Sequence, residues 1–124
     1  MAQLIHSLTD EEPISLLNAP PKRCFFIYGS QPDKQRGQHR HRHSMMLMNC
    51  VRGSVRVYVQ TPSHDQYFTL DDSTKYLLLS PDDWRLMYDF TPDAILVVTC
   101  DYPYLEEDYI EAPYREPVLA QPNP

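Results

Sequence analysis

Twelve prolines and three glycines divide this 124-residue chain into short pieces. A proline cannot donate a backbone hydrogen bond and fixes its own φ angle, so it interrupts helices and is excluded from central strands. No stretch of about 12 residues keeps the apolar period of 3.6 residues that an amphipathic helix requires. The sequence therefore predicts an all-β protein built from short strands.

Eight short segments, apolar or alternating and mostly separated by turn residues, are the predicted strands. They are Arg23–Tyr28, Gln38–His41, Met45–Arg52, Ser54–Gln60, Gln66–Leu70, Lys75–Leu79, Arg85–Asp89 and Ala94–Thr99. Strands at this spacing are typical of a β-sandwich or a small barrel. The run Ile95–Val98 is predicted to be buried on both faces, whereas Val55, Val57 and Val59 alternate with other residues as in a half-buried strand.

The composition limits the size and the partners of the protein. A chain of 124 residues fits one domain with one modest core. Seventeen acidic residues against 11 basic ones give a net charge of −6, which repels phosphate backbones and argues against nucleic-acid binding. No apolar run approaches the roughly 20 residues of a membrane helix, and no secretion signal is visible. We therefore expect a cytoplasmic protein without membrane contact.

The three cysteines, Cys24, Cys50 and Cys100, are odd in number and far apart in the sequence. Each stands in an apolar run. This pattern favours buried free thiols over disulfides or a zinc site.

A basic, histidine-rich segment, Gln35–His43, contains the best candidates for chemistry. Because side chains alternate along a strand, His39 and His41 are predicted to share one face, and the same period allows His43 to join them. Paired imidazoles suit metal binding or proton transfer, whereas a purely structural interpretation makes the segment a charged strand edge. A local group of basic side chains could hold one diphosphate: Lys34, Arg36, Arg40, Arg42 and His43.

Several motifs follow one another in the order seen in one known family. They are Arg23–Tyr28, Arg36–His41, Gly53–Val57, Trp84–Phe90, and Asp101–Tyr102 with Glu107–Ile110. Over Arg23–Glu116 the chain resembles the cupin sugar 3,4-ketoisomerases, which include the WxcM-like proteins. The resemblance implies a single cupin jelly-roll barrel over residues 23–116 and an N-terminal segment, residues 1–22, of the kind exchanged between subunits of a dimer. Residues 117–124 are expected to be a flexible tail.

The resemblance also implies an activity. Members of the family act on dTDP-4-keto-6-deoxyglucose, so we expect an isomerase that moves the keto group of a dTDP-4-keto-6-deoxyhexose from C4 to C3 in deoxysugar biosynthesis. The expected partners are this dTDP-sugar and a second copy of the chain, with no cofactor. A metal is not expected, because the usual Glu ligand of a cupin is replaced within Ser44–Met46, and the second-motif His position is Arg85, which has no lone pair to donate.

Site roles follow from the spacing and the resemblance together. His39 or His41 is expected to be the base that transfers the proton through an enediol, and the other imidazole would orient it or hydrogen-bond the oxygen. Which histidine is the base stays open. The expected substrate contacts are Arg36, Arg85, Tyr28, Tyr88 and Trp84.

The chain also departs from the family pattern. The region Thr9–Ile14 lacks the Arg that relatives commonly have there, the strand Cys24–Ile27 lacks their Tyr, Met46 replaces a Gln and Arg85 replaces a His. Two alternatives therefore stay open: a non-catalytic cupin that binds a nucleotide sugar, and a metal-dependent cupin oxygenase. The stereochemistry of the product at C4 is also open, and Glu106–Asp108 is interpreted as a solvated turn.

Overall fold

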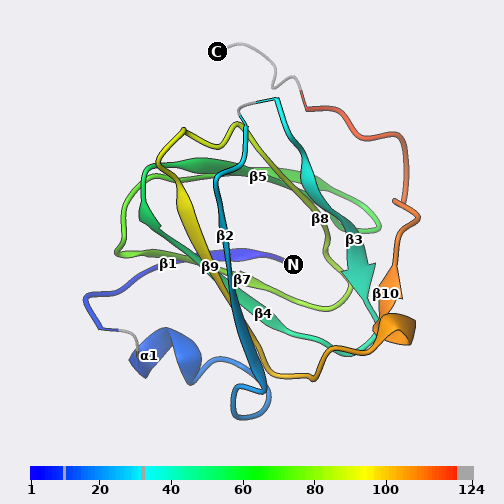
Figure 1. The fold of residues 1–124 in the computed structure, drawn as a ribbon. Coiled ribbons are helices and arrows are strands. Elements are labelled where there is room, and N and C mark those ends of the chain that lie inside the picture. Colours follow the sequence, from blue (N-terminus) through cyan, green and yellow to red (C-terminus); the bar gives the residue numbers. More distant parts are fainter. Residues whose placement is uncertain (10, 32, 120–124) are drawn as a thin grey trace.

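The computed structural model describes residues 1–9, 11–31 and 33–119. Within them, two five-stranded antiparallel sheets face each other, as Figure 1 shows. One, here the β4 sheet, has the order β1 (Gln3–His6), β7 (Lys75–Leu79), β4 (Met46–Arg52), β9 (Ile95–Cys100) and β2 (Arg23–Tyr28). The other, the β8 sheet, has the order β10 (Tyr109–Ile110), β3 (Arg36–His41), β8 (Trp84–Tyr88), β5 (Val55–Gln60) and β6 (Asp65–Leu70). Helix is limited to α1 (Glu11–Ile14) and the 3₁₀ turn η1 (Glu106–Asp108) in these ranges.

All eight predicted strands are present, each with its ends within two residues of the prediction. The prediction of a single all-β domain is confirmed. The sequence did not predict β1 and β10, which are short and add one strand to an edge of each sheet. The arrangement matters because β10 pairs with β3, the strand that holds the histidines.

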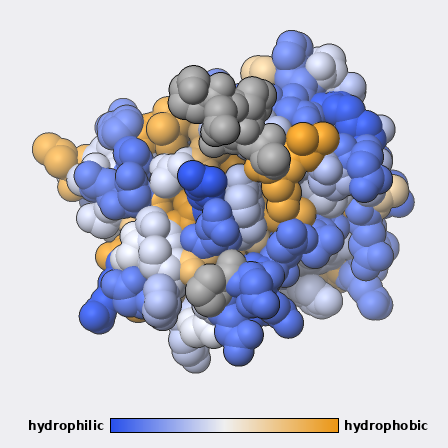
Figure 2. Space-filling view, turned by 90° about the horizontal axis from the view of Figure 1, so that it is seen from above, coloured by the Kyte–Doolittle hydropathy of each residue, from blue (hydrophilic) through white to orange (hydrophobic). Residues whose placement is uncertain are grey.

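The core lies between the two sheets and consists of side chains that alternate inward from the long strands. It includes Met46, Met48, Val55, Val57, Leu77, Leu79, Leu96 and Val98. Along β9, Leu96 and Val98 are buried while Ile95 and Val97 are partly exposed, so the prediction that this strand is buried on both faces is wrong. In the view from above, hydrophilic residues cover most of the surface and hydrophobic ones show only in limited patches (Figure 2).

The outer face of the β8 sheet is covered by the C-terminal residues 111–119, here called the strap. Trp84, Leu86 and Tyr88 point to this face and pack with Tyr58 in a second buried cluster that the strap covers. For this reason Tyr58 and Gln60 are buried, and the prediction of a half-buried β5 is wrong at these two positions.

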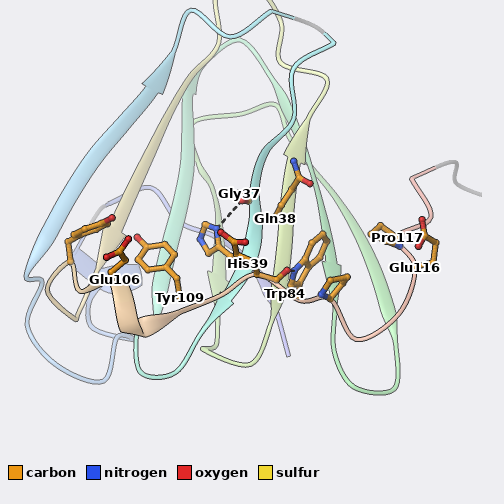
Figure 3. Close-up of a pocket in the computed structure, with 11 residues that line it drawn as sticks. Gly37, Gln38, His39, Trp84, Glu106, Tyr109, Glu116 and Pro117 are labelled. Carbon is orange, nitrogen blue, oxygen red and sulfur yellow. Dashed lines mark hydrogen bonds between the residues drawn. The ribbon is translucent and has the colours of Figure 1, made fainter.

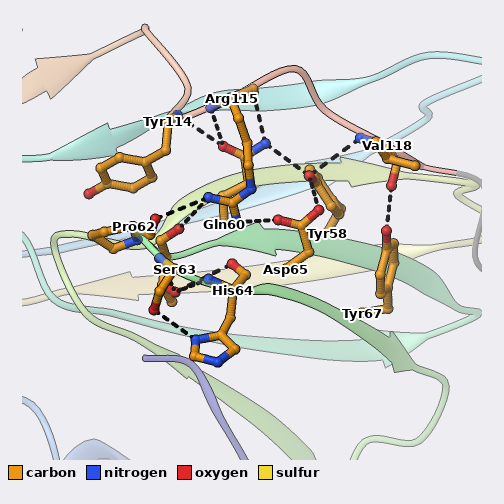
Figure 4. A network of polar contacts seen from close by, with 11 residues as sticks. Tyr58, Gln60, Pro62, Ser63, His64, Asp65, Tyr67, Tyr114, Arg115 and Val118 are labelled. Atoms are coloured by element: carbon orange, nitrogen blue, oxygen red, sulfur yellow. Dashed lines mark hydrogen bonds and ion pairs between the residues drawn. The ribbon is translucent and has the colours of Figure 1, made fainter.

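Buried Gln60 holds the strap by both ends of its amide. Its Oε1 accepts hydrogen bonds from the backbone N–H groups of Tyr114 at 2.9 Å and Arg115 at 3.3 Å, and its Nε2 donates to the Arg115 carbonyl at 3.0 Å (Figure 4). Further along, Val118 donates to the Tyr58 hydroxyl, and its carbonyl accepts from Tyr67. The first residues of the expected flexible tail, 117–119, are thus bound to the sheet, whereas 120–124 lie outside the described residues.

The N-terminal segment also belongs to the sheets. β1 pairs with β7 of the same chain, with Gln3 opposite Leu78, and exchange of this strand between subunits stays a prediction. Cys50 and Cys100 are buried free thiols, but Cys24 is exposed because it lies on the outward side of β2; the expectation of burial is wrong for it. Among the described residues, no helix has the length and apolarity to cross a membrane.

Candidate active site

Strand β3 turns its histidines into the interior by means of a bulge. Arg36 lies opposite Met87 and Gly37 opposite Leu86, but the next pair is His39 with Arg85, so Gln38 is an extra residue in the strand. Regular alternation would place Arg36 and the histidines on opposite faces. The bulge lets all three face the interior, because it shifts the alternation by one residue.

The interior space beside Arg36 and His39 is a cavity of about 290 Å³, and His41 packs directly behind its lining, against His39 and Tyr109. Its lining comes from both sheets: Phe25 and Ile27 of β2, Met46 and Met48 of β4, Val98 of β9, Arg85 and Met87 of β8, Arg36, Gly37 and His39 of β3, and Tyr109 of β10. Most of the lining is apolar, so the few polar groups act in surroundings that exclude water and strengthen electrostatic interactions.

His41 is oriented by a carboxylate from a distant part of the chain. Its Nδ1 lies 2.8 Å from Oδ2 of Asp108, 67 residues later, and both side chains are buried. Asp108 also accepts from the Ser44 hydroxyl at 2.5 Å and from the His43 backbone N–H at 2.7 Å. Because a carboxylate only accepts, the His41 proton lies on Nδ1, and Nε2 keeps its lone pair. This Nε2 is buried and has no hydrogen-bond partner among the described residues.

Both imidazoles are neutral at physiological pH. Burial, followed by the positive charge of Arg85, lowers the pKa of His39 to about 4 and that of His41 to about 3. For Asp108, burial acts to raise the pKa, but the hydrogen bonds from Ser44 and His41 outweigh it and hold the pKa below its usual value. The site therefore pairs an ionised carboxylate with a neutral imidazole, an arrangement suited to general-base catalysis.

Arg85 places a fixed positive charge in the same cavity. Its guanidinium is fully buried and donates to the Asp83 carbonyl at 2.9 Å, to the Met46 sulfur at 3.1 Å and to the Ser80 carbonyl at 3.1 Å. Burial lowers its pKa to about 10, which still leaves it protonated at neutral pH. These three acceptors are uncharged, so the guanidinium is available to stabilise negative charge on a bound molecule.

Tyr109 packs against both histidines. Its ring centroid is 4.7 Å from that of His39 and 4.6 Å from that of His41. Its hydroxyl accepts a hydrogen bond from Nη2 of Arg23 at 2.9 Å, which fixes the ring from the side of β2. Asp108 was not predicted as a site residue, and because it is buried the interpretation of Glu106–Asp108 as a solvated turn is wrong for it.

A second, more open cavity of about 770 Å³ lies between β3, β10 and the strap. Figure 3 shows His39 at its centre, with Tyr109 and Glu106 on one side and Trp84 and the strap on the other. Trp84 is fixed here because its Nε1 donates to the Glu111 carbonyl at 2.9 Å. Gly37, His39 and Tyr109 line both cavities, which therefore adjoin at β3 and β10.

Two of the expected substrate contacts lie elsewhere. Tyr28 is exposed on the outward side of β2, and Tyr88 points to the outer face of β8, where it packs in the cluster of Trp84. Alternation along their strands directs both rings away from the interior cavity. His43 does not join the histidine pair either, because it is exposed and stacks on Tyr102 at 4.9 Å.

The basic side chains that were expected to hold one diphosphate do not lie together. Arg36 lines the interior cavity and donates to the Ser30 hydroxyl at 3.2 Å, whereas Arg40 lies over the Tyr114 ring on the outer face. Arg42 donates to the Glu107 carbonyl. Only Arg36 of these three therefore stands at the interior cavity. In the described part of the chain, no three His, Cys, Asp or Glu side chains are grouped so as to hold a metal.

Comparison with known proteins identifies the family. The family model described as FdtA, "WxcM-like, C-terminal", matches residues 6–116. The chain belongs to the WxcM-like family. A curated relative, the TDP-4-oxo-6-deoxy-alpha-D-glucose-3,4-oxoisomerase of Aneurinibacillus thermoaerophilus, is 33% identical over 89 residues, which cover 72% of this chain and 64% of the relative. The chain thus spans less than two thirds of the length of that curated relative.

Solved structures agree with this assignment. QdtA, a sugar 3,4-ketoisomerase from Thermoanaerobacterium thermosaccharolyticum solved with TDP, matches with a TM-score of 0.80 and 28% identity over 90% of this chain and 88% of its own. A variant of QdtA with one histidine replaced by asparagine, solved with TDP-4-keto-6-deoxyglucose, matches with a TM-score of 0.80 and 27% identity over 90% and 87%. WlaRA, a TDP-fucose-3,4-ketoisomerase from Campylobacter jejuni, shares the fold with a TM-score of 0.77 at 24% identity over 90% and 89%. The predicted cupin barrel is confirmed.

Proposed function

We propose that this WxcM-like protein is a metal-independent sugar-nucleotide 3,4-ketoisomerase that acts on a dTDP-4-keto-6-deoxyhexose in deoxysugar biosynthesis. The observation that carries the proposal is the combination of a neutral, carboxylate-backed His41, packed against the cavity-lining His39, with the buried cation of Arg85 in the lining of the same cavity. The names of the relatives support it, since the curated relative is a 3,4-oxoisomerase and QdtA was solved with TDP and with the keto sugar.

The reaction requires two proton movements. Nε2 of His41 takes the proton from C3; the electrons of the C3–H bond form the C3–C4 double bond, and the carbonyl electrons move to O4. Protonated His41 then donates this proton to C4 of the enediolate, while the hydroxyl proton on O3 is transferred to O4 and the electrons left on O3 form the C3 carbonyl. We assign the carbon-bound proton to His41 because the carboxylate of Asp108 stabilises the imidazolium that forms.

Arg85 acts on the charge that develops at O4. A buried donor that faces the enediolate needs no reorganisation during the reaction, and removal of one such donor typically costs about 100- to 1000-fold in rate. Arg85 repels the positive charge of protonated His41. This repulsion is offset because the imidazolium and the negatively charged enediolate form in the same step, and the enediolate attracts both cations. In this proposal Arg36, at the cavity lining, contacts the diphosphate.

The test is incubation of the purified protein with dTDP-4-keto-6-deoxyglucose in deuterated buffer, followed by proton NMR of the sugar. We expect the C3 proton signal to disappear and a 3-keto product to form. His41→Gln should abolish this change, whereas Arg52→Ala, at an exposed surface site, should leave it unaffected. A wild-type protein that binds the sugar without altering it would refute the activity.

The second candidate function is binding of a nucleotide sugar without turnover. It is favoured by Thr9–Ile14, which contains no arginine, and by the contact between Arg85 and Met46, two positions at which the sequence departs from the family pattern. Saturable binding with an unchanged sugar spectrum would select this function over the isomerase.

We further propose that the protein is a cytoplasmic homodimer. The outer face of the β4 sheet carries a contiguous apolar patch in which Phe26 is 61% exposed, Tyr28 70% and Val51 47%, with Ile95 and Val97 beside them. Patches of this kind mark contact surfaces, and a two-fold dimer would pair this face with itself. An unpaired, exposed Cys24 suits a reducing compartment.

A further inference from the structure

The bulge in β3 has an unusual backbone. Gly37 and Gln38 both have positive φ angles, +83° and +63°. The conformation at Gln38 costs an L-residue about 1 kcal/mol or more, and such costs tend to persist where the surrounding structure uses the conformation. At Gly37 a side chain is also excluded by space, because a Cβ would lie 3.0 Å from the Met87 sulfur and 3.1 Å from the Arg85 carbonyl oxygen.

The bulge brings a backbone carbonyl to the ring of His39. The carbonyl oxygen of Gly37 lies 3.0 Å from Nδ1 of His39, two residues later (Figure 3). In a regular strand the carbonyls point sideways to the neighbouring strands, so this contact depends on the two left-handed residues. A carbonyl oxygen only accepts; the ring must therefore carry its proton on Nδ1 and leave Nε2 with a lone pair.

We propose that the Gly37–Gln38 bulge is a positioning device that fixes His39 as the Nδ1–H tautomer and so makes its Nε2 a proton acceptor in catalysis. This inference rests on the proposed isomerase function. In this tautomer His39 cannot donate a hydrogen bond to the enediolate, because its Nε2 carries no hydrogen. It assigns His39 instead to the proton on the O3 hydroxyl, which its Nε2 accepts and then returns to O4.

The different roles of His41 and His39 follow from the hydrogen-bond acceptor at the Nδ1 atom of each ring. Asp108, an ionised carboxylate, stabilises a full positive charge on His41, as removal of a carbon-bound proton requires. The neutral carbonyl of Gly37 stabilises a charge on His39 less, which suits the exchange of a hydroxyl proton between two oxygens. The two rings lie 4.8 Å apart between centroids and nearly perpendicular, so in this proposal they act on neighbouring atoms of one sugar ring.

Deletion of Gln38 isolates the effect of the bulge. Without this residue Gly37 and His39 are consecutive and can pair regularly with Leu86 and Arg85, so His39 keeps its inward direction but loses the carbonyl. Nitrogen-15 NMR of labelled histidine, assigned with His39→Gln, distinguishes a protonated from an unprotonated ring nitrogen without any activity measurement. We expect the wild type to show Nδ1–H for His39 and the deletion variant to lose this single tautomer, with kcat reduced about 10- to 100-fold and KM changed much less.

Asp89→Gly is the matched control, because Asp89 also has a positive φ, +53°, but lies at the end of β8 away from both histidines. It should keep both the His39 tautomer and kcat. The proposal is overturned if wild-type His39 carries its proton on Nε2, or if the deletion variant retains the tautomer and the rate. A wild type with the expected tautomer but no turnover refutes the proposed function and the catalytic role of His39, while it confirms that the bulge fixes the ring.

Discussion

Replacement of Asp108 by asparagine should separate the orientation of His41 from the folding of the site. The substitution is nearly isosteric, so the backbone N–H of His43 keeps an acceptor oxygen. The asparagine NH₂ group can then face Nδ1 of His41, which favours the opposite tautomer, with the proton on Nε2. An imidazole protonated at Nε2 cannot remove the C3 proton.

The size of the effect follows from the contact that is changed. The Nδ1 to Oδ2 hydrogen bond is 2.8 Å long, buried and charge-assisted, and such bonds contribute about 1.5–3 kcal/mol. If this stabilisation is made fully in the transition state, where His41 becomes an imidazolium, kcat falls about 10- to 150-fold at 1.4 kcal/mol per tenfold. The KM should change little, because the carboxylate does not contact the substrate.

Ser44→Ala is the matched control for this experiment. It removes another hydrogen bond to the same Asp108 oxygen, at 2.5 Å, but leaves the carboxylate and its contact with His41 in place. Initial rates from the NMR assay and thermal unfolding should be measured for both variants. We expect similar losses of stability and a much larger loss of kcat for Asp108→Asn. Equal losses of kcat, or an Asp108→Asn rate within about twofold of wild type, would refute the role of Asp108 in orienting the base.

The structure supports four further predictions. Because the pKa values of His39 and His41 are about 4 and 3, kcat/KM should stay level from pH 8 to about 5 and fall near pH 4; a fall at pH 6–7 would contradict this. Below pH 6.5, the ordinary pKa of histidine, both rings are protonated in the unfolded chain but stay neutral in the folded protein. The free energy of unfolding should therefore decrease as the pH falls from about 6.5 to 4, and it should decrease less in His39→Gln. Arg85→Met should keep or raise the melting temperature while it lowers kcat about 100-fold, since a buried charge contributes little to stability; unchanged kcat would contradict its role. Phe26→Glu should convert a dimer to a monomer in light scattering, whereas Leu8→Glu, at a residue 92% exposed outside the patch, should not; a Phe26→Glu dimer would exclude this face.

The strands could be predicted because alternation and turn residues are local properties. His39 and His41 share one face as period two requires, and Arg85 reaches the interior, so part of the site was also visible in the sequence. Two-residue alternation could not predict that Arg36 faces the interior together with the histidines, because this depends on the extra residue in the bulge. The bulge has no local sequence signal, because only one of its two residues with positive φ, Gly37, is a glycine.

Asp108 illustrates the second limit. In the sequence it closes an acidic run, and such a run is usually solvated. Its burial results from a contact with His41, 67 residues away, together with the pairing of β10 with β3. The same kind of long-range packing buries Gln60, whose amide pairs with the backbone of the strap. Only the Asp-Tyr-Ile segment of the family resemblance pointed to this region.

The order in which the chain is synthesised gives the Asp108 contact a further consequence. The ribosome makes His41 early, within the first half of the chain, but the carboxylate that orients it comes after all the long strands of both sheets. Until η1 and β10 dock on the edge of β3, the nascent barrel contains an imidazole without a defined tautomer. Folding intermediates that lack this docking step should therefore be compact and yet chemically inactive, so that the catalytic base is assembled only late in folding.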